Sequence, residues 1–326
     1  MDADRFFAPR IHVVCGKGGV GKTTVASALA VVAARQGRAV CVAEVDGKGS
    51  LPRLFGADQP SYQPSELSPG VWGLNILPED ALAEYLQVQY HMRHISRILT
   101  STHFVDYITT AAPGLKDILV LGKIWYLEQN RWADARGRQF DTIIVDAPAS
   151  GHMLSFLSSP IGLADAVQTG PIRRQADGLI DLLRDPERTH AHLVTLAEEM
   201  PVKETLETAA ALDAEVKIAS GVVFANAVFN SSLETDEVAS MDSRAEELTA
   251  RALEVGIELD DEDMDALRGY AHWLAARCEI QRRHLGHLDK GLAQPIVELP
   301  YLFSSGLALP DVELLADAIE ERIEEL

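Results

Sequence analysis

A glycine-rich segment between a short apolar run and a long helical one constrains the fold of this chain most. Residues 15–24 read CGKGGVGKTT and contain the pattern G-x-x-x-x-G-K-[ST] from Gly16 to Thr23. The preceding run, IHVVC (11–15), is typical of a buried strand, and TTVASALAVVAARQG (23–37) is typical of a helix closed by a glycine. This order of strand, loop and helix predicts a phosphate-binding loop, because backbone N–H groups and the helix N-terminus converge on one anion.

The residues of the loop differ in the chemistry that they offer a nucleotide. Glycines let backbone N–H groups approach phosphate oxygens without an obstructing Cβ. We predict that Lys22 neutralises the β- and γ-phosphates, that the Thr23 hydroxyl contacts Mg²⁺ and that Thr24 reaches the α-phosphate. The predicted nucleotide-binding residues of the loop are Gly16, Gly18, Gly19, Val20, Gly21, Lys22, Thr23 and Thr24. A glycine-rich turn without a ligand is the alternative, which the flanking strand and helix disfavour.

Several further apolar runs predict a parallel sheet. They lack the polar alternation of a half-exposed strand and lie at 39–45, 140–147, 192–196, 217–226 and 295–300. Strands that are apolar on both faces belong inside a parallel sheet covered by helices. We therefore expect an α/β fold with a doubly wound, mostly parallel sheet of the P-loop NTPase type. One domain over residues 1–326 is expected, with helical insertions at about 79–135 and 233–290.

Two aspartates follow predicted strands and should lie at the same edge of the sheet as the phosphate loop. Asp46 comes after the second strand, and Asp146 ends the run IIVD. The carboxyl ends of parallel strands face the ligand in a doubly wound sheet, so both carboxylates are expected near the phosphates. Asp146 is the predicted member of the Mg²⁺ shell. For Asp46, a helix cap is the alternative.

Several segments together resemble one family of nucleotide-dependent dimers. GKGGVGKTT (16–24), AEVDGKGSL (43–51) and DTIIVDAPASGHML (141–154) resemble segments of the arsenite-pump and tail-anchored-protein-targeting ATPases. The stretches 109–124 and 170–183 look most like actinobacterial single-domain anion-transporter ATPases. This resemblance implies a Mg²⁺-dependent ATP hydrolase that works as a homodimer or as a heterodimer with a related ATPase subunit.

The resemblance also implies roles for single residues. Lys17, the extra lysine of the loop, would cross the dimer interface to the partner's nucleotide, and Asp46 would position the attacking water. Lys17, Lys22 and Asp46 thus form the implied catalytic set. Gly151 and His152 match the family's second switch, although His152 could equally be an ordinary residue at a helix start.

Later segments supply the residues implied near the adenine base. Asn226 would contact the base edge through its amide, with a turn asparagine as the alternative, and Pro300 precedes a loop whose backbone flanks the base. Glu204 and Thr205 match a Glu-Thr pair that opens a helix in the family. For this pair, capping or packing and ligand contact are both open. No Asn/Thr-Lys-x-Asp segment of guanine-binding proteins occurs, so ATP is the predicted nucleotide.

Composition excludes several classes of function. A formal net charge of −20 opposes binding to nucleic acid. No run is long and apolar enough for an integral membrane segment, and no signal segment opens the chain, so the cytoplasm is the expected location. The three cysteines, Cys15, Cys41 and Cys278, form no metal-binding pattern and are expected to pack in the interior.

The resemblance predicts a dimeric switch that couples ATP hydrolysis to a conformational change acting on a partner. A membrane protein or a client polypeptide is open as that partner, and the apolar run 117–127 could line a client groove or belong to the core. Two alternatives remain. One is a partitioning or positioning ATPase, for which the acidic C-terminal helix is unfavourable, and the other is an ATP-dependent metabolic enzyme of the same fold.

Overall fold

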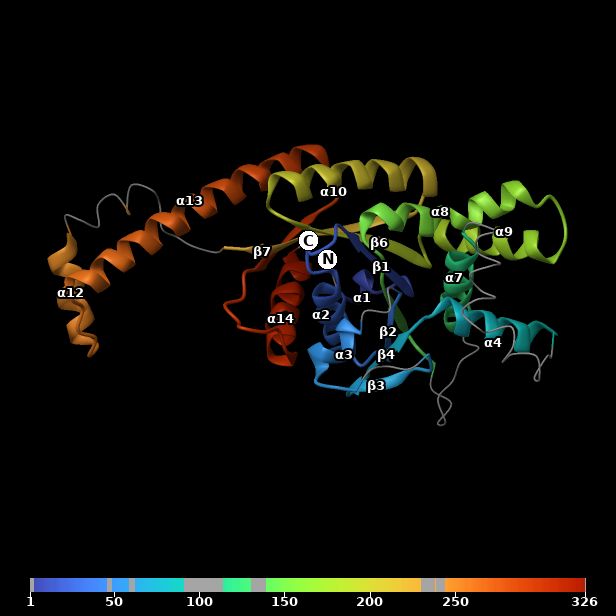
Figure 1. Cartoon of the computed structure of the whole chain (residues 1–326), viewed down its shortest axis with the longest axis horizontal. Coiled ribbons are helices and arrows are strands. Elements are labelled where there is room, and N and C mark those ends of the chain that lie inside the picture. The colour runs from blue at the N-terminus through green and yellow to red at the C-terminus, as the bar shows by residue number, and fades with distance from the viewer. Residues whose placement is uncertain are drawn as a thin grey trace.

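An eight-stranded sheet forms the centre of the described chain (Figure 1). The computed structural model describes residues 3–45, 49–58, 62–90, 114–129, 139–229, 238 and 244–325. The strand order is β3-β4-β2-β5-β1-β6-β7-β8, and each neighbouring pair is parallel except β3 with β4. The strands are β1 Ile11–Gly16, β2 Val40–Glu44, β3 Ser65–Ser68, β4 Val71–Asn75, β5 Thr142–Asp146, β6 Thr189–Leu196, β7 Ala219–Val228 and β8 Ile296–Pro300. The predicted α/β fold with a mostly parallel sheet is confirmed.

Helices cover both faces of the sheet. Alternate residues of a strand point to opposite faces, so Val13 and Cys15 join one core while Val14 joins the other. The Val14 face is covered by α1 Ala3–Phe6, α2 Lys22–Arg35, α3 Ser50–Phe55 and α14 Leu309–Glu325. The Cys15 face is covered by α7 Leu115–Glu128, α8 Ser150–Ala166, α9 Pro171–Arg184, α10 Glu199–Ala211 and the π-helical turn η1 Leu212–Val216. This is the predicted doubly wound arrangement.

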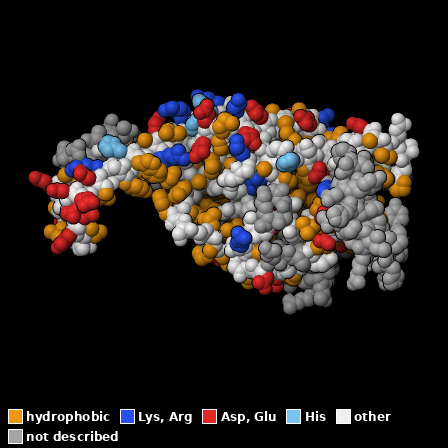
Figure 2. All heavy atoms as spheres, viewed as in Figure 1, with side chains coloured by type: hydrophobic (Ala, Val, Ile, Leu, Met, Phe, Trp, Pro, Cys, Tyr) orange, Lys and Arg blue, Asp and Glu red, His pale blue; other side chains and the backbone are white. Residues whose placement is uncertain are grey.

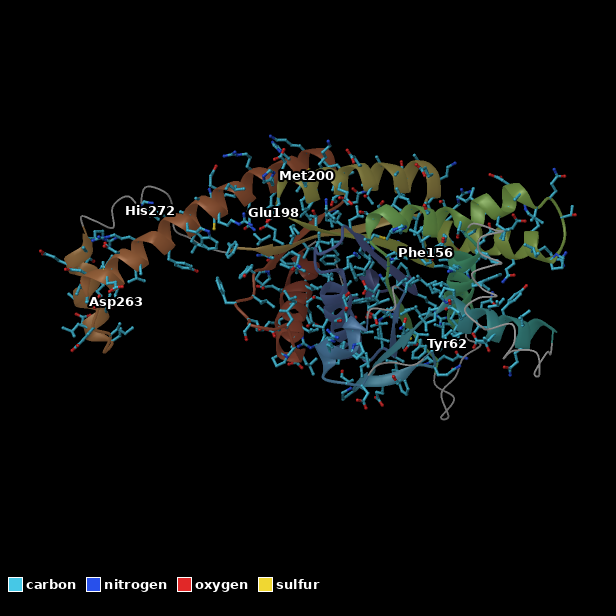
Figure 3. The ribbon with its side chains drawn as sticks, in the orientation of Figure 1. Tyr62, Phe156, Glu198, Met200, Asp263 and His272 are labelled. Atoms are coloured by element: carbon cyan, nitrogen blue, oxygen red, sulfur yellow. The ribbon has the colours of Figure 1, made fainter. Side chains whose placement is uncertain are left out.

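The described parts of both expected insertions are helical. The first contains α4 Pro78–Tyr90 and α7, and the second contains α12 Ala245–Glu254 and α13 Asp261–Gly291. Helix α13 reaches out from the body as an arm with α12 at its far end (Figure 1). Arg277 of this arm pairs at 2.6 Å with Glu198, the residue before α10. Figure 3 labels Glu198 near the end of the arm that joins the body. One sheet takes strands from residue 11 to residue 300, which agrees with the one-domain organisation; that organisation stays a prediction.

The apolar run 117–127 belongs to the core. Ile118, Leu121, Ile124 and Leu127 are buried within the cluster on the Cys15 face of the sheet. The core interpretation of this run is therefore the one that the structure supports. All three cysteines are buried as well, in agreement with a packing role. No helix among the described residues is both long and apolar enough to cross a membrane.

The sheet carries a hairpin that the sequence did not reveal. Strands β3 and β4 pair antiparallel, and β4 then adds to β2 in parallel. Gly73 lies in the middle of β4, where a Cβ would come within 2.5 Å of the Leu67 side chain. The close approach explains why a glycine interrupts an otherwise ordinary short strand.

Two buried histidines connect β1 to β6 through a chain of hydrogen bonds. The backbone N–H of Val222 donates to Nδ1 of His192 at 3.1 Å, so the proton of this imidazole lies on Nε2. That Nε2 donates to Nδ1 of His12 at 3.0 Å, and Nε2 of His12 donates to the Pro9 carbonyl at 2.9 Å. Both rings are neutral, because burial lowers the pKa of His12 to about 3 and lowers that of His192 well below its ordinary value.

We predict that this pair destabilises the protein in mild acid. Below a pH of about 6.5, histidines of the unfolded chain bind protons that the native chain excludes, so the free energy of unfolding falls as the pH falls. Each histidine contributes about 1.4 kcal/mol per pH unit. Urea unfolding between neutral pH and pH about 5 should show a shallower pH slope for His12→Gln than for the wild type. The exposed His287→Gln is the control. Equal slopes for wild type and His12→Gln would contradict the assignment.

Candidate functional site

Glycine conformations shape the phosphate loop between β1 and α2. Gly16 has a φ of +150°, and a Cβ there would collide with the Val194 carbonyl of β6. Gly21 has a φ of +94°, and a Cβ there would collide with the side-chain amide of Asn226. Both positions therefore exclude other residues for two reasons, backbone conformation and space. The loop therefore packs against the carboxyl-terminal parts of β6 and β7.

Two side chains donate hydrogen bonds to carbonyl groups of the loop backbone. The Lys22 ammonium donates to the Lys17 carbonyl at 3.1 Å, so it lies across its own loop. The Asn226 amide donates to the Val20 carbonyl at 2.9 Å. The adenine-edge role of Asn226 stays a prediction, and it would require the amide to exchange this bond for one to the base.

Thr23 and two acidic residues meet on one face of the sheet. Glu44 of β2 and Asp146 of β5 are register partners on neighbouring parallel strands, so their side chains share a face. It is the face covered by α2, because Val42 and Ile144, two residues earlier in each strand, pack in that core. The Thr23 hydroxyl donates to Oδ2 of Asp146 at 2.6 Å.

These residues fit a divalent cation. Glu44 is 2% exposed; its Oε1 accepts from the Ser50 N–H at 2.9 Å, while the buried Oε2 has no hydrogen-bond partner. A buried carboxylate oxygen without a partner is costly, and a cation would compensate it. No group of three or more His, Cys, Asp or Glu side chains in the described ranges could hold a metal ion alone. Mg²⁺ needs no such group, since one or two carboxylates and substrate phosphates usually bind it.

Lys17 lies in an ion pair within its own chain. Its ammonium is 2.7 Å from Oε2 of Glu204, whose Oε1 accepts a hydrogen bond from the Ser150 hydroxyl. These two bonds lower the pKa of Glu204, the one from Lys17 most. The sequence matched Glu204 to a family pair but gave no indication of this contact. The expectation that Glu204 and Thr205 open a helix is wrong, because α10 begins at Glu199 and the pair lies in its second turn.

The other predicted residues lie around this centre. Val20 and Thr24 are buried, and Gly18 and Gly19 are exposed in the loop. Gly151 and His152 are exposed in the first turn of α8, where His152 lies close enough to lower the pKa of Asp117, which burial raises. Pro300 ends β8. Asp46 lies outside the described residues.

We predict that Gly21→Ala costs more stability than Gly19→Ala. Both glycines have a left-handed φ, at +94° and +84°, but only at Gly21 would a Cβ meet another atom, the Asn226 amide. The shared backbone cost is about 1–2 kcal/mol, and the collision should add about 1–3 kcal/mol at Gly21. Urea unfolding should show this difference, and Asn226→Ala should reduce the cost of Gly21→Ala toward that of Gly19→Ala. Equal costs for the two alanine variants would show that Asn226 does not confine the loop.

Comparison with known proteins gives the family. A family model described as Anion-transporting ATPase matches residues 9–171. The ATPase BagA of Mycobacterium tuberculosis is 33% identical over 334 residues, which cover 98% of this chain and 94% of that protein. An arsenical pump-driving ATPase of Acidiphilium multivorum is 27% identical over 59% of this chain and 35% of its own, and the ATPase get3 of Schizosaccharomyces japonicus is 25% identical over 51% of each. The chain therefore belongs to the anion-transporting ATPase family and is an ATPase, as its sequence predicted.

Proposed function

We propose that this ATPase is a dimeric switch in which Lys17 of each subunit acts at the nucleotide of the other. One observation carries the proposal. Lys22 already lies across its own phosphate loop, whereas the side chain of Lys17 turns away to Glu204 and is 35% exposed. A second lysine at the rim of the loop is thus accessible to a partner subunit, where it can neutralise charge that develops during phosphoryl transfer.

Within one subunit, different residues are proposed to bind the phosphates, hold the cation and position the attacking water. The loop N–H groups and Lys22 bind the phosphates, and the α2 N-terminus adds favourable partial charge. Thr23, Asp146 and Glu44 would hold Mg²⁺, which, when bound, supplies positive charge at the β- and γ-phosphates. Asp46 is proposed to orient the attacking water. Catalysis is then positioning and charge neutralisation, with no covalent intermediate.

Exposed aromatic side chains support a partner-binding face beside this site. Tyr301 and Phe303 lie one and three residues after Pro300, and their rings contact each other and Phe229, the residue after β7. Trp273 of the arm packs edge-on against Phe229. Figure 2 shows hydrophobic side chains gathered where α13 leaves the body. An exposed aromatic group of this kind is typical of protein–protein contact.

The loop after β5 offers a route from the phosphates to the helices. Asp146 ends β5, and α8 begins only four residues later at Ser150, with Gly151 and His152 in its first turn. Helix α8 packs against α7 and α9, so a movement at its start would reach these helices. We propose that the helices transmit the nucleotide state to a partner or client, which could be a membrane protein.

The alternatives find less support. Helix α14 buries its apolar face, with Val312, Leu315 and Ile319 against α2, so that face is not offered to a membrane. This disfavours a partitioning ATPase that uses its C-terminal helix for anchoring.

The positions of the cysteines also disfavour an arsenite-binding role. Cys15 and Cys41 lie on strands separated by β5, and Cys278 lies on α13, so the cysteines form no soft-metal site that would bind arsenite.

The divalent-cation role of Glu44 predicts a selective loss. Glu44→Gln keeps an oxygen that can accept from Ser50 but removes the charge that would face the cation. We expect Mn²⁺ to bind the complex of this variant with ADP at least about tenfold more weakly, since loss even of a residue that only supports the metal ligands typically costs that much. Electron paramagnetic resonance of Mn²⁺ measures this directly, and the exposed Glu66→Gln on β3 is the control. Unchanged Mn²⁺ affinity in Glu44→Gln would remove Glu44 from the cation site.

The action of Lys17 in the partner predicts complementation between inactive variants. Lys17→Ala and Asp46→Asn should each abolish ATP hydrolysis in homodimers. In mixed dimers, the Lys17→Ala subunit keeps its Asp46 and receives Lys17 from its partner, so one of two sites should recover activity. We expect up to about a quarter of wild-type activity from an equal mixture, since half the dimers are mixed and each holds one intact site.

The mixture must be shown to exchange subunits, for example by co-purification of differently tagged variants. A mixture that exchanges but stays inactive would contradict action in the partner. If the native dimer contains a related second chain, the same variants are paired with that chain.

A further inference from the structure

The partner of Lys17, Glu204, binds two separate segments of the chain at the same time. Each of its two carboxylate oxygens contacts a different one of these segments beside the phosphate loop. Oε2 contacts Lys17 in the loop after β1, at 2.7 Å, and Oε1 contacts Ser150 in the segment after β5. Glu204 itself belongs to α10, which packs on β6 and on the arm helix α13. One carboxylate therefore connects the phosphate loop, the start of α8 and the helical layer.

The position of this carboxylate makes it a competitor of the nucleotide. Lys22 lies close enough to Glu204 to help lower its pKa. The negative charge of Glu204 thus lies within the field of both loop lysines, where the phosphates of a bound nucleotide would add further negative charge. Like charges at this range repel each other, and the phosphates attract Lys17 away from Glu204. Because Lys17 and Glu204 are 35% and 30% exposed, their ion pair is weak and easily broken.

We propose that Glu204 is a positioning residue that keeps Lys17 in an intramolecular resting place until nucleotide phosphates release it for the partner's site. Ser150 fixes the carboxylate for this task and reports its release to α8, because it opens that helix. The inference rests on the proposed function, since release matters only if Lys17 works in the other subunit. Without nucleotide, Lys17 of each subunit then stays on Glu204 of its own chain and does not reach the partner's site.

The first test measures Lys17 itself in the nucleotide-free protein. A small amine-reactive acetylating reagent is applied to the wild type and to Glu204→Gln, and modification of each lysine is followed by mass spectrometry. The amide oxygen of Gln can still accept from Ser150, so this variant removes only the ion pair. Lys17 should react several-fold faster in Glu204→Gln, because a side chain held on a carboxylate is less accessible than one that moves freely.

Controls separate this effect from a change in overall structure. Lys203 and Lys290 are exposed and serve as references within the same protein, and Glu207→Gln changes an exposed carboxylate one turn further along α10. Neither reference lysine should change its rate in Glu204→Gln, and Lys17 should not change in Glu207→Gln. An unchanged rate at Lys17 in Glu204→Gln would overturn the resting place, whatever the protein's function.

The second test measures release through dimer formation. Light scattering follows dimerisation as a non-hydrolysable ATP analogue with Mg²⁺ is added. Glu204→Gln should dimerise at several-fold lower analogue concentration than the wild type, because no ion pair must break first. A higher concentration, or the same one, would overturn the proposed release. A wild type that does not dimerise with the analogue at any concentration would contradict the proposed function, and the lysine reactivity then decides the resting place alone.

Discussion

The parallel pairing of β1 with β5 and β6 is the constraint on which the rest of the site depends. It places the carboxyl ends of three buried strands at one edge, so that the phosphate loop, the end of β5 and the approach to α10 meet there. The contact is close enough that Gly16 faces the Val194 carbonyl with no room for a Cβ. The residues proposed to bind phosphate and cation, and the partner of Lys17, therefore come from elements far apart in the sequence, although the same short strands position them.

The site also brings lysine and carboxylate side chains of opposite charge close together. Two lysines, Lys17 and Lys22, face three carboxylates, those of Glu44, Asp146 and Glu204. In the proposed function Glu44 and Asp146 would bind a cation, whereas Glu204 would lose its partner when phosphates arrive. These five side chains carry a formal charge of −1 before nucleotide and cation bind, and binding would rearrange their ion pairs. Such a rearrangement would link nucleotide state to conformation without a large movement of the sheet.

The sequence predicted those parts of the protein that a local pattern of residues encodes. Six core strands were expected from apolar runs, because burial on both faces leaves a continuous apolar segment, and the loop from Gly16 to Thr24 was identified by its spacing. The β3–β4 hairpin was missed, since β4 is short and carries Gly73. Glu44 and the contact between Lys17 and Glu204 could not be predicted either. Their roles depend on strand order and on which residues of separate elements become neighbours, and no local pattern encodes that.

An experimental structure of the dimer with Mg²⁺, ADP and a mimic of the γ-phosphate tests the central claim most directly. Lys17 of one subunit should lie beside the phosphates of the other, and its former partner Glu204 should no longer contact it. Lys17 still bound to Glu204 of its own chain, at a site filled with nucleotide and phosphate mimic, would contradict the account.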